Sequence, residues 1–346
     1  MADSAIRTAD VSTAIEEVSR TGLAELHTHL GGSVDSAVLW TLAHEQGIAL
    51  PVKDYWDFDR LVTVDPRGVE GLSQLDGIYH WTELIQSSPL AVERSVHGAI
   101  GGAYRRQNIT TLELRFNPMK RNRGGERDLD HIIMAAIRGL DRASLEYPLV
   151  QAGLILMMDR TFTREQNEII VEKAIRYAPR GVVGVDIAGP RPQAGRYRYA
   201  DLAPLVETAR DAGLGITIHV GEEGGDDGVA EVGEVVESLR PDRIGHGILA
   251  ARDEEAMRLL RDAEVVLEIC PTSNLLTRAL PDEDAIRDTC RTFVDRGVQF
   301  TVATDGPEMM RTHLQDELAL LVRIGALDED ELIRVNALAH RAAFLT

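Results

Sequence analysis

Two histidines separated by a single residue end the first apolar run of the chain. His27 and His29 lie in the stretch LAELHTHLGGS, residues 23–33. In a strand, residues i and i+2 point to the same face, so both imidazoles would project into the same space. A His-x-His pair of this kind can chelate a metal ion, although the pair alone is also compatible with two polar residues at a strand end.

Two groups far along the chain could complete a metal site. His219 ends the run ITIH, and Asp305 ends the run FTVATD. Three imidazoles and one carboxylate form a plausible set of Zn²⁺ ligands, with one position left for water. Asp305 could instead cap the helix expected from Pro307. Because all four groups stand at the tips of apolar runs, the sequence predicts a metal site with the ligands His27, His29, His219 and Asp305.

Two further residues are suited to proton transfer. Glu222 follows His219 by three residues, and a carboxyl group beside a metal that it does not ligate can carry protons. The alternative for Glu222 is a carboxylate at a helix start, the role expected for Asp226 and Asp227. His246 stands between two glycines in RIGHG, so its immediate neighbours in the sequence offer no side chains for it to pack against. It could instead contact a metal-bound water. A purely structural histidine is the alternative there.

Cys270 and the other histidines are weaker candidates. Cys270 is followed by Pro271 and has no base nearby on its run, so it is expected to be a buried small residue. His80 stays a candidate because it lies in a segment expected to cover the site. The remaining histidines fall in helix-like segments and are expected to serve packing or the surface: His44, His97, His131, His313 and His340.

Eight short apolar runs must position these residues. Each ends in a polar or glycine-rich tip, and most show little alternation, which is typical of buried parallel strands. Helix-like segments lie between them, and several begin near Asp or Ser and end at Gly. The runs span residues 22–32, 109–118, 149–159, 181–190, 213–223, 242–247, 264–274 and 298–307.

The alternation of eight strands with helices predicts an α/β fold, the (β/α)8 TIM-type barrel. An open, doubly wound sheet is the alternative. The barrel is favoured because chemically able residues recur at the carboxyl tip of nearly every run, and in a barrel those tips converge on one mouth. A chain of 346 residues can form one such barrel with insertions, so residues 1–346 are interpreted as a single domain.

Two segments fall outside the repeating pattern. Residues 48–90 are too long for a simple connection from a strand to a helix, and they contain Trp56, Phe58, Tyr79 and Trp81. They predict a helical lid insertion after the first strand, and a peripheral subdomain without substrate contact is the alternative. Residues 307–345 predict two or three extra helices at the C-terminal end.

Composition limits the classes of partner. The formal net charge of −19 argues against non-specific binding to nucleic acid and against docking on anionic membranes. The two cysteines, Cys270 and Cys290, fit a reducing compartment. The N-terminal segment has no apolar signal-peptide core, and no apolar run is long enough to span a membrane. We therefore expect a cytoplasmic protein with a small-molecule partner, and the oligomeric state stays open.

Six motifs in a fixed order give the chain a resemblance to a known family. AELHTHLGGS, VDIAG, HVGE, RIGHG, EICPTSN and ATDGP follow the order found in the adenosine deaminase family, and the resemblance covers nearly the whole chain. It implies a (β/α)8 barrel with one catalytic Zn²⁺ per chain. It also implies that the zinc ligands are His27, His29, His219 and Asp305.

The resemblance further implies roles for the residues around the metal. Glu222 would protonate the ring nitrogen beside the reacting carbon, and His246 would orient the attacking water and take its proton. The catalytic set is thus Glu222, His246 and Asp305, and the backbone of Gly189 would meet a purine ring. Because Zn²⁺ lowers the pKa of a bound water toward about 7, attack at an amino-bearing ring carbon would release ammonia. The implied activity is zinc-dependent hydrolytic deamination of a 6-aminopurine-like compound.

Two glycines depart from the family pattern. Members that act on adenosine usually carry an acidic residue that contacts the ribose where this chain has Gly31. They usually carry a second aspartate, which binds a purine ring nitrogen, where this chain has Gly306. A pocket without partners for a substrate's polar groups loses discrimination for it. We therefore expect a modified derivative or another cyclic amidine, rather than plain adenosine, to be the better substrate. Glu308, Met309 and Met310 are candidates to line the altered pocket.

Two other classes of function stay open. A hydrolase of lactones or esters with two metal ions is disfavoured, since no lysine stands at the tip of the third, fourth or fifth run to bridge the metals. A non-catalytic binding protein is disfavoured because binding alone would not require the full set of histidines and carboxylates. The other zinc-deaminase design, with H-x-E and P-C-x-x-C motifs, is not matched, because Cys270 precedes Pro271 and no second cysteine is nearby.

Overall fold

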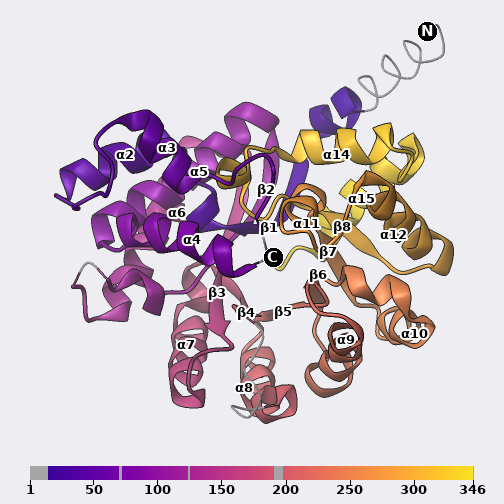
Figure 1. The fold of residues 1–346 in the computed structure, drawn as a ribbon. Coiled ribbons are helices and arrows are strands. Elements are labelled where there is room, and N and C mark those ends of the chain that lie inside the picture. The colour runs from indigo at the N-terminus through magenta and orange to yellow at the C-terminus, as the bar shows by residue number, and fades with distance from the viewer. Residues whose placement is uncertain (1–14, 70–71, 124, 191–197, 346) are drawn as a thin grey trace, which may run out of the picture.

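The computed structural model describes residues 15–69, 72–123, 125–190 and 198–345. Eight parallel strands pair in the order of the sequence, and Figure 1 shows them at the centre with helices around them. A doubly wound sheet reverses its strand order, so the consecutive order excludes that alternative and confirms the (β/α)8 TIM-type barrel. The strands are β1 (Leu23–His29), β2 (Ile109–Phe116), β3 (Gln151–Asp159), β4 (Val182–Ala188), β5 (Gly215–Val220), β6 (Arg243–His246), β7 (Val266–Ile269) and β8 (Phe300–Val302).

The barrel closes between its first strand and the segment after its last. A parallel bridge joins Thr28 to Asp305. The N–H of His29 donates to the carbonyl of Asp305 at 2.7 Å, and the N–H of Asp305 donates to the carbonyl of His27 at 2.9 Å. Three of the predicted metal ligands are therefore tied together through the backbone.

The strands are buried on both faces, which explains why they read as apolar runs with little alternation. They are shorter than the runs because the polar tips continue as loops at the carboxyl end of the sheet. β8, for example, ends at Val302, and Asp305 follows it in the loop. The loops at the carboxyl ends of the strands are where a barrel of this kind carries its functional residues.

Side-chain caps start most of the helices between the strands. Asp128, Asp253 and Asp282 accept hydrogen bonds from backbone N–H groups in the first turns that follow them, as predicted. One helix begins instead after Thr163, which forms a capping box with Gln166. The helices are α2 (Ser36–Glu45), α3 (Tyr55–Val62), α4 (Leu72–Ile85), α5 (Pro89–Gln107), α6 (Leu129–Glu146), α7 (Arg164–Tyr177), α8 (Tyr199–Asp211), α9 (Asp226–Leu239), α10 (Glu254–Asp262), α11 (Pro271–Leu276), α12 (Glu283–Arg296), α13 (Pro307–Met310), α14 (Leu314–Arg323) and α15 (Glu329–Ala342).

The described part of the segment between β1 and β2 is largely helical, as predicted, and comprises α2 to α5. Phe58 of α3 is fully buried, whereas its neighbour Trp56 is 68% exposed. α4 contributes residues to the wall of the cavity described below. The role of the segment as a lid stays a prediction.

Three helices follow β8, within the two or three that were expected, and α15 packs against β1 and β8. Beyond α15, the ring of Phe344 lies so close to Gly184 and Gly215 that a side chain on either glycine would overlap it. The guanidinium of Arg243 lies over the same ring, 3.6 Å from its centroid. The end of the chain therefore closes the barrel near the amino ends of β4 and β5, opposite the predicted metal site.

Within the described ranges, no helix is both long enough and apolar enough to cross a membrane. Cys270 and Cys290 are free and buried. Burial raises the pKa of the Cys270 thiol well above its ordinary value. The structure therefore agrees with the interpretation of Cys270 as a buried small residue.

Candidate active site

Four side chains from three parts of the barrel converge at the carboxyl end of the sheet. Nε2 of His29 lies 3.1 Å from Nε2 of His219 and 3.3 Å from Oδ1 of Asp305. Nε2 of His27 lies 3.9 Å from the same carboxylate oxygen. Ring nitrogens of the three histidines all lie within 4.8 Å of one another. The structure thus brings the four predicted ligands together around one point.

In His27 and His219, a carboxylate binds Nδ1 of the imidazole ring. The Nε2 atoms of these rings therefore face the other ligands of the cluster. Nδ1–H of His27 donates to Glu268 at 2.7 Å, and Nδ1–H of His219 donates to Asp186 at 3.0 Å. Nε2 of His27 is buried and has no hydrogen-bond partner among the described residues. Burial lowers the pKa of all three histidines well below the ordinary value, so the rings are neutral and offer lone pairs. The donor set therefore fits a zinc ion.

A second combination of ligand atoms is chemically less suitable. His27, His246 and Cys270 also place one ligand atom each within 4.8 Å of the others. The thiol of Cys270 keeps its proton because burial raises its pKa, and Sγ donates weakly to the carbonyl of Glu268 at 3.7 Å. Since a thiol binds metal as the thiolate, the histidines and Asp305 form the better site.

Buried charges beneath the cluster hold its two supporting carboxylates. Arg115 donates to Asp186 at 3.1 Å and to Glu268 at 2.8 Å, and Arg243 donates to Glu268 at 2.6 Å. Burial alone would raise the pKa of Glu268, but Arg115 and Arg243 together outweigh it and hold the pKa below its ordinary value. Glu268 therefore stays ionised and orients the ring of His27.

These four supporting residues are absent from the predicted site. They share a signal in the sequence, because each is a charged residue inside or at the edge of an apolar run, as in TTLELRF, VVGVDIA, RIGH and VLEI. A charge buried in a strand is costly unless it is paired. Such a residue therefore predicts a partner inside the barrel.

Glu222 and His246 stand beside the metal-ligand cluster. Oε2 of Glu222 lies 3.5 Å from Nε2 of His246. Asn274 Nδ2 donates to Nδ1 of His246 at 3.0 Å and so holds the ring from its other side. Burial, together with the charge of Glu223, raises the pKa of Glu222 to about 7, and burial lowers the pKa of His246. A carboxyl group with a pKa near neutrality can donate a proton, and a neutral imidazole can accept one.

Asp305 and His246 both hold left-handed backbone conformations, with φ of 64° and 62°. Residues other than glycine adopt this region only where the surroundings fix it, and such positions cluster at functional sites. Oδ2 of Asp305 accepts a hydrogen bond from Ser273 at 2.7 Å, which leaves Oδ1 toward the histidines. The alternative role of Asp305 as a helix cap is wrong, because Gly306 occupies the N-cap position of α13.

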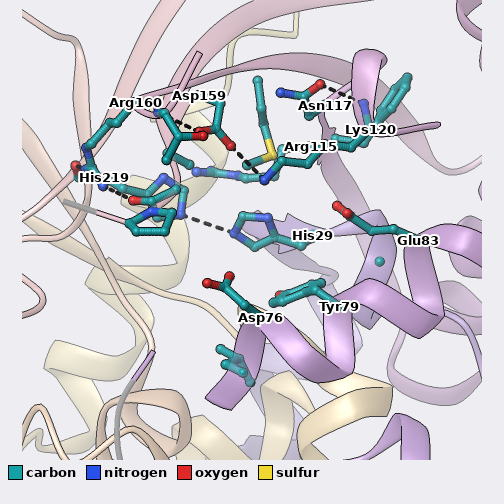
Figure 2. A pocket seen from close by; sticks show the side chains of 18 of the residues that line it. His29, Asp76, Tyr79, Glu83, Arg115, Asn117, Lys120, Asp159, Arg160 and His219 are labelled. Atoms are coloured by element: carbon teal, nitrogen blue, oxygen red, sulfur yellow. Dashed lines mark hydrogen bonds and ion pairs between the residues drawn. The ribbon is translucent and has the colours of Figure 1, made fainter. Parts of the chain in front are cut away.

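A cavity of about 340 Å³ adjoins the cluster, a volume within the range of small-molecule sites. Gly31 and Gly189 line it, together with Glu222 and His246, whereas Gly306 does not. In Figure 2, His29 and His219 face each other between two groups of lining residues. One group is Asp76, Tyr79 and Glu83 on α4. The other is Asn117 and Lys120, which follow β2, and Asp159, which ends β3.

Gly306 is separated from the cavity by neighbouring groups. A Cβ built on Gly306 would lie 3.4 Å from Cα of Gly32 and 3.6 Å from the hydroxyl of Tyr79. A Cβ built on Gly31 would lie 3.0 Å from the ring of Tyr79. The aromatic side chain from α4 therefore lies next to both Gly31 and Gly306.

The three residues expected near the altered pocket lie elsewhere. Met309 and Met310 are buried in a separate apolar cluster with Val64, Val69 and Leu75. Glu308 pairs with Arg106. None of the three lines the cavity, so that expectation is wrong. The short helix α13 places the two methionines against apolar side chains of the segment between β1 and β2 instead.

Basic residues form part of the cavity wall and are also absent from the predicted set. Lys120 and Arg121 follow β2, and Arg160 follows β3. Nζ of Lys120 lies 2.6 Å from Oδ2 of Asp159. The sequence KRNRGG after β2 resembles an exposed turn, so it gives no sign that three of its residues, Lys120, Arg121 and Arg123, line a cavity.

His80 stayed a candidate in the sequence, and it lies at the exposed side of the same cavity. Nδ1 of His80 accepts a hydrogen bond from Arg123 at 3.1 Å. His80 is therefore a rim residue, and it is not part of the metal-ligand cluster. The other histidines outside the predicted site do not line the cavity.

The fold and the site define a class of protein, the metal-dependent aminohydrolases built on a (β/α)8 barrel. The family model for adenosine deaminase matches residues 22–346, and the chain belongs to this family. Its members are typically metal-dependent, and they support a purine-type deamination for this enzyme.

Individual relatives cover most of the chain. The chain is 28% identical over 320 residues to the adenosine deaminase of Vibrio vulnificus, which covers 92% of this chain and 93% of that protein. It is 32% identical over 325 residues to the aminodeoxyfutalosine deaminase of Acidothermus cellulolyticus, which covers 87% and 82%. The solved adenine deaminase of Arthrobacter aurescens matches with a TM-score of 0.81 at 21% identity, over 94% of each chain, and supports the fold.

Proposed function

We propose that this protein catalyses the zinc-dependent hydrolytic deamination of a 6-aminopurine-like compound, with release of ammonia. The observation that carries the proposal is the convergence of three neutral imidazoles and the Asp305 carboxylate, beside Glu222 and His246. This donor set suits one Zn²⁺ per chain. Its ligands would be His27, His29, His219 and Asp305.

The chain's own groups have complementary roles in this proposal. When bound, Zn²⁺ would supply an activated water as the nucleophile. His246 would accept a proton at Nε2, since burial keeps its ring neutral. Glu222 would donate a proton to the ring nitrogen beside the reacting carbon, because a pKa of about 7 leaves a protonated fraction at neutral pH.

Gly189 would let the backbone approach the flat face or edge of the base. It has a φ of 93°, and a Cβ built on it would lie 2.8 Å from Oδ1 of Asp159. A side chain at this position would therefore meet both a strained backbone and a blocked space. This supports the substrate-binding role proposed for Gly189.

The identity of the compound depends on the two glycines that replace acids. The relatives are named as deaminases of adenosine, aminodeoxyfutalosine and adenine, so a 6-aminopurine derivative is the leading class. Gly31 and Gly306 both lie next to Tyr79 and offer no acid to a ribose or a ring nitrogen. A cyclic amidine other than adenosine is the alternative substrate.

The experiment is an ammonia-release assay on a panel of aminopurines, their nucleosides and aminopterins, with and without a strong chelator. We expect turnover of at least one 6-aminopurine, its loss on chelation, and its return with added Zn²⁺. Turnover that persists in fully metal-free protein would overturn the proposal. Ammonia from an aminopterin but from no purine would favour the alternative substrate.

A two-metal hydrolase of lactones or esters is the second candidate. Among the residues that the structure describes, both possible ligand groups share His27, so they describe a single site. Two bound metals per chain would revive this candidate. A single-domain organisation over residues 1–346, a cytoplasmic location and the absence of nucleic-acid partners stay proposals from length and composition.

A further inference from the structure

A buried arginine lines the cavity, and two of its side-chain nitrogens have no hydrogen-bond partner among the described residues. Arg121 ends the short turn after β2, and only 1% of its surface is exposed. Its Nε and Nη1 atoms have no hydrogen-bond partner within the described ranges. Its Nη2 atom lies 3.5 Å from the position that a Cβ on Gly31 would occupy. The guanidinium therefore lies in the space beside Gly31, the position at which members that act on adenosine were expected to carry an acid.

The acidic residues nearest to this loop are paired with other cations. Glu83 lies 3.6 Å from Nη2 of Arg123, and Asp159 lies 2.6 Å from Nζ of Lys120. Burial lowers the pKa of Arg121, although a guanidinium stays charged at any physiological pH. A buried charge is costly unless an opposite charge accompanies it. Glu83 acts on Arg121 only through its charge, since its carboxylate pairs with Arg123. No described carboxylate forms a direct ion pair with the Arg121 guanidinium, and a ligand in the cavity could.

Other residues that line the cavity also have buried polar atoms without a described partner, and most of these atoms are donors. Oδ1 of Asn117 accepts from the backbone N–H groups of Met119 and Lys120, so its buried Nδ2 is left without a partner. The buried hydroxyl of Tyr79 and Nε of Arg160 are also without partners in the part of the chain that the structure describes. Unpaired donors of this kind select an acceptor-rich group on the ligand.

We propose that the substrate carries an anionic group, a carboxylate or a phosphate, and that Arg121 pairs with this group in the space beside Gly31. This inference rests on the proposed deamination and deepens it, because it names the chemical class of the substrate. Gly31 and Arg121 act together in this scheme. An acid at position 31 would neutralise the guanidinium inside the protein, whereas glycine leaves the guanidinium for an anion of the ligand.

The test compares matched neutral and anionic ligands on the zinc-loaded full chain. Binding of a 6-oxopurine nucleoside, its 5′-monophosphate and its 5′-carboxylate is measured by calorimetry, and kcat/KM is measured for the three corresponding 6-aminopurines. We expect at least one anion to bind at least about tenfold more tightly than the neutral nucleoside, as a charge-assisted contact allows. The phosphate and carboxylate arms show which anion fits.

Variants of Arg121 test whether this residue causes the preference for the anionic ligand. Arg121→Met should remove the preference for the anion, and Arg121→Lys should retain part of it. Arg180→Met is the control, since Arg180 is exposed, pairs with Asp141 at 2.9 Å and does not line the cavity. It should leave the preference unchanged. An equal affinity for neutral and anionic ligands, or an equal loss of both in Arg121→Met, would overturn the inference.

Thermal unfolding of the unliganded variants separates a binding role from a structural one. Because the buried guanidinium forms no direct ion pair with a described residue, Arg121→Met should keep or raise the melting temperature. A lower melting temperature with an unchanged ligand preference would show that Arg121 serves the fold and would overturn the inference. If no compound is deaminated but Arg121→Met still removes tighter binding of an anion, the proposed function fails and the anion site stands.

Discussion

Glu222 is the residue whose surroundings most directly set the proposed chemistry. Burial and the neighbouring charge of Glu223 raise its pKa to about 7, and Arg160 opposes this shift only in part. A raised pKa means that the carboxyl is protonated below about pH 7 and ionised above it. A proton donor is needed in its protonated form, so the donor becomes less available as the pH rises through this value.

Replacing Glu222 should therefore change both the rate and its pH dependence. In the parent enzyme, kcat/KM should fall as the pH rises above about 7. Glu222→Gln should lower kcat by at least about 100-fold and remove this limb of the profile, while zinc content is unchanged. Asp226→Asn, at the exposed first position of α9, is the control and should behave like the parent. A Glu222→Gln enzyme with full turnover would refute the donor role.

Single site residues could be predicted where their positions in the sequence alone placed their side chains on the same face of a strand or at the same end of the barrel. His27 and His29 are two residues apart on a strand, and His219, His246 and Asp305 stand at the tips of other strands, so the barrel brings them together. Arg121 could not be predicted in this way. Its burial depends on how the turn after β2 folds against the cavity and α4, and a basic turn has no periodicity that indicates the inward side.

At the level of elements, α4 is the part of the inserted segment that reaches the cavity. Tyr79, Asp76 and Glu83 of this helix line the cavity, whereas the buried Phe58 of α3 packs in the core. The aromatic side chains of residues 48–90 therefore have two roles, lining the cavity and packing in the core, and the sequence alone could not tell which residue has which role. Both uses require an apolar ring, and only the packing of the helices decides which ring faces the cavity.

If α4 covers the substrate, then ligand binding should protect its backbone. Hydrogen exchange, followed by mass spectrometry, should slow in α4 when a 6-oxopurine product is bound. Exchange in α12, which does not line the cavity, should stay the same. Equal exchange in α4 with and without a bound product would favour the alternative of a peripheral subdomain without substrate contact.

The strands were predictable because both of their faces are buried, so each one reads as a short apolar run. Their ends were less predictable. The last run was expected to extend to residue 307, but β8 ends at Val302. Beyond it the chain adopts a left-handed conformation at Asp305, and the carboxylate of this residue faces the histidines. Such local backbone conformations depend on tertiary contacts, and these contacts cannot be predicted from the order of residue types in the strand.

At the scale of the whole molecule, the formal net charge does not describe the charges around the cavity, which acidic and basic side chains line together. The chain carries a formal net charge of −19, yet Arg121, Lys120 and Arg160 line the cavity beside β2 and β3. A bulk charge describes the average surface and predicts weak binding to polyanions, which is a different property from the local field of a small cavity. Composition could therefore exclude classes of partner, but it could not indicate the charge of the substrate.

The proposed function requires that the four converging ligands hold one metal ion and that turnover depends on this ion. The most direct measurement is a titration of metal-free protein with Zn²⁺, in which bound zinc and turnover of a 6-aminopurine substrate are recorded together. Activity should rise in proportion to bound zinc and stop rising at one ion per chain, and His219→Ala should show neither tight zinc binding nor turnover. Full activity before zinc is added, or a rise that continues to two ions per chain, would contradict the proposed function.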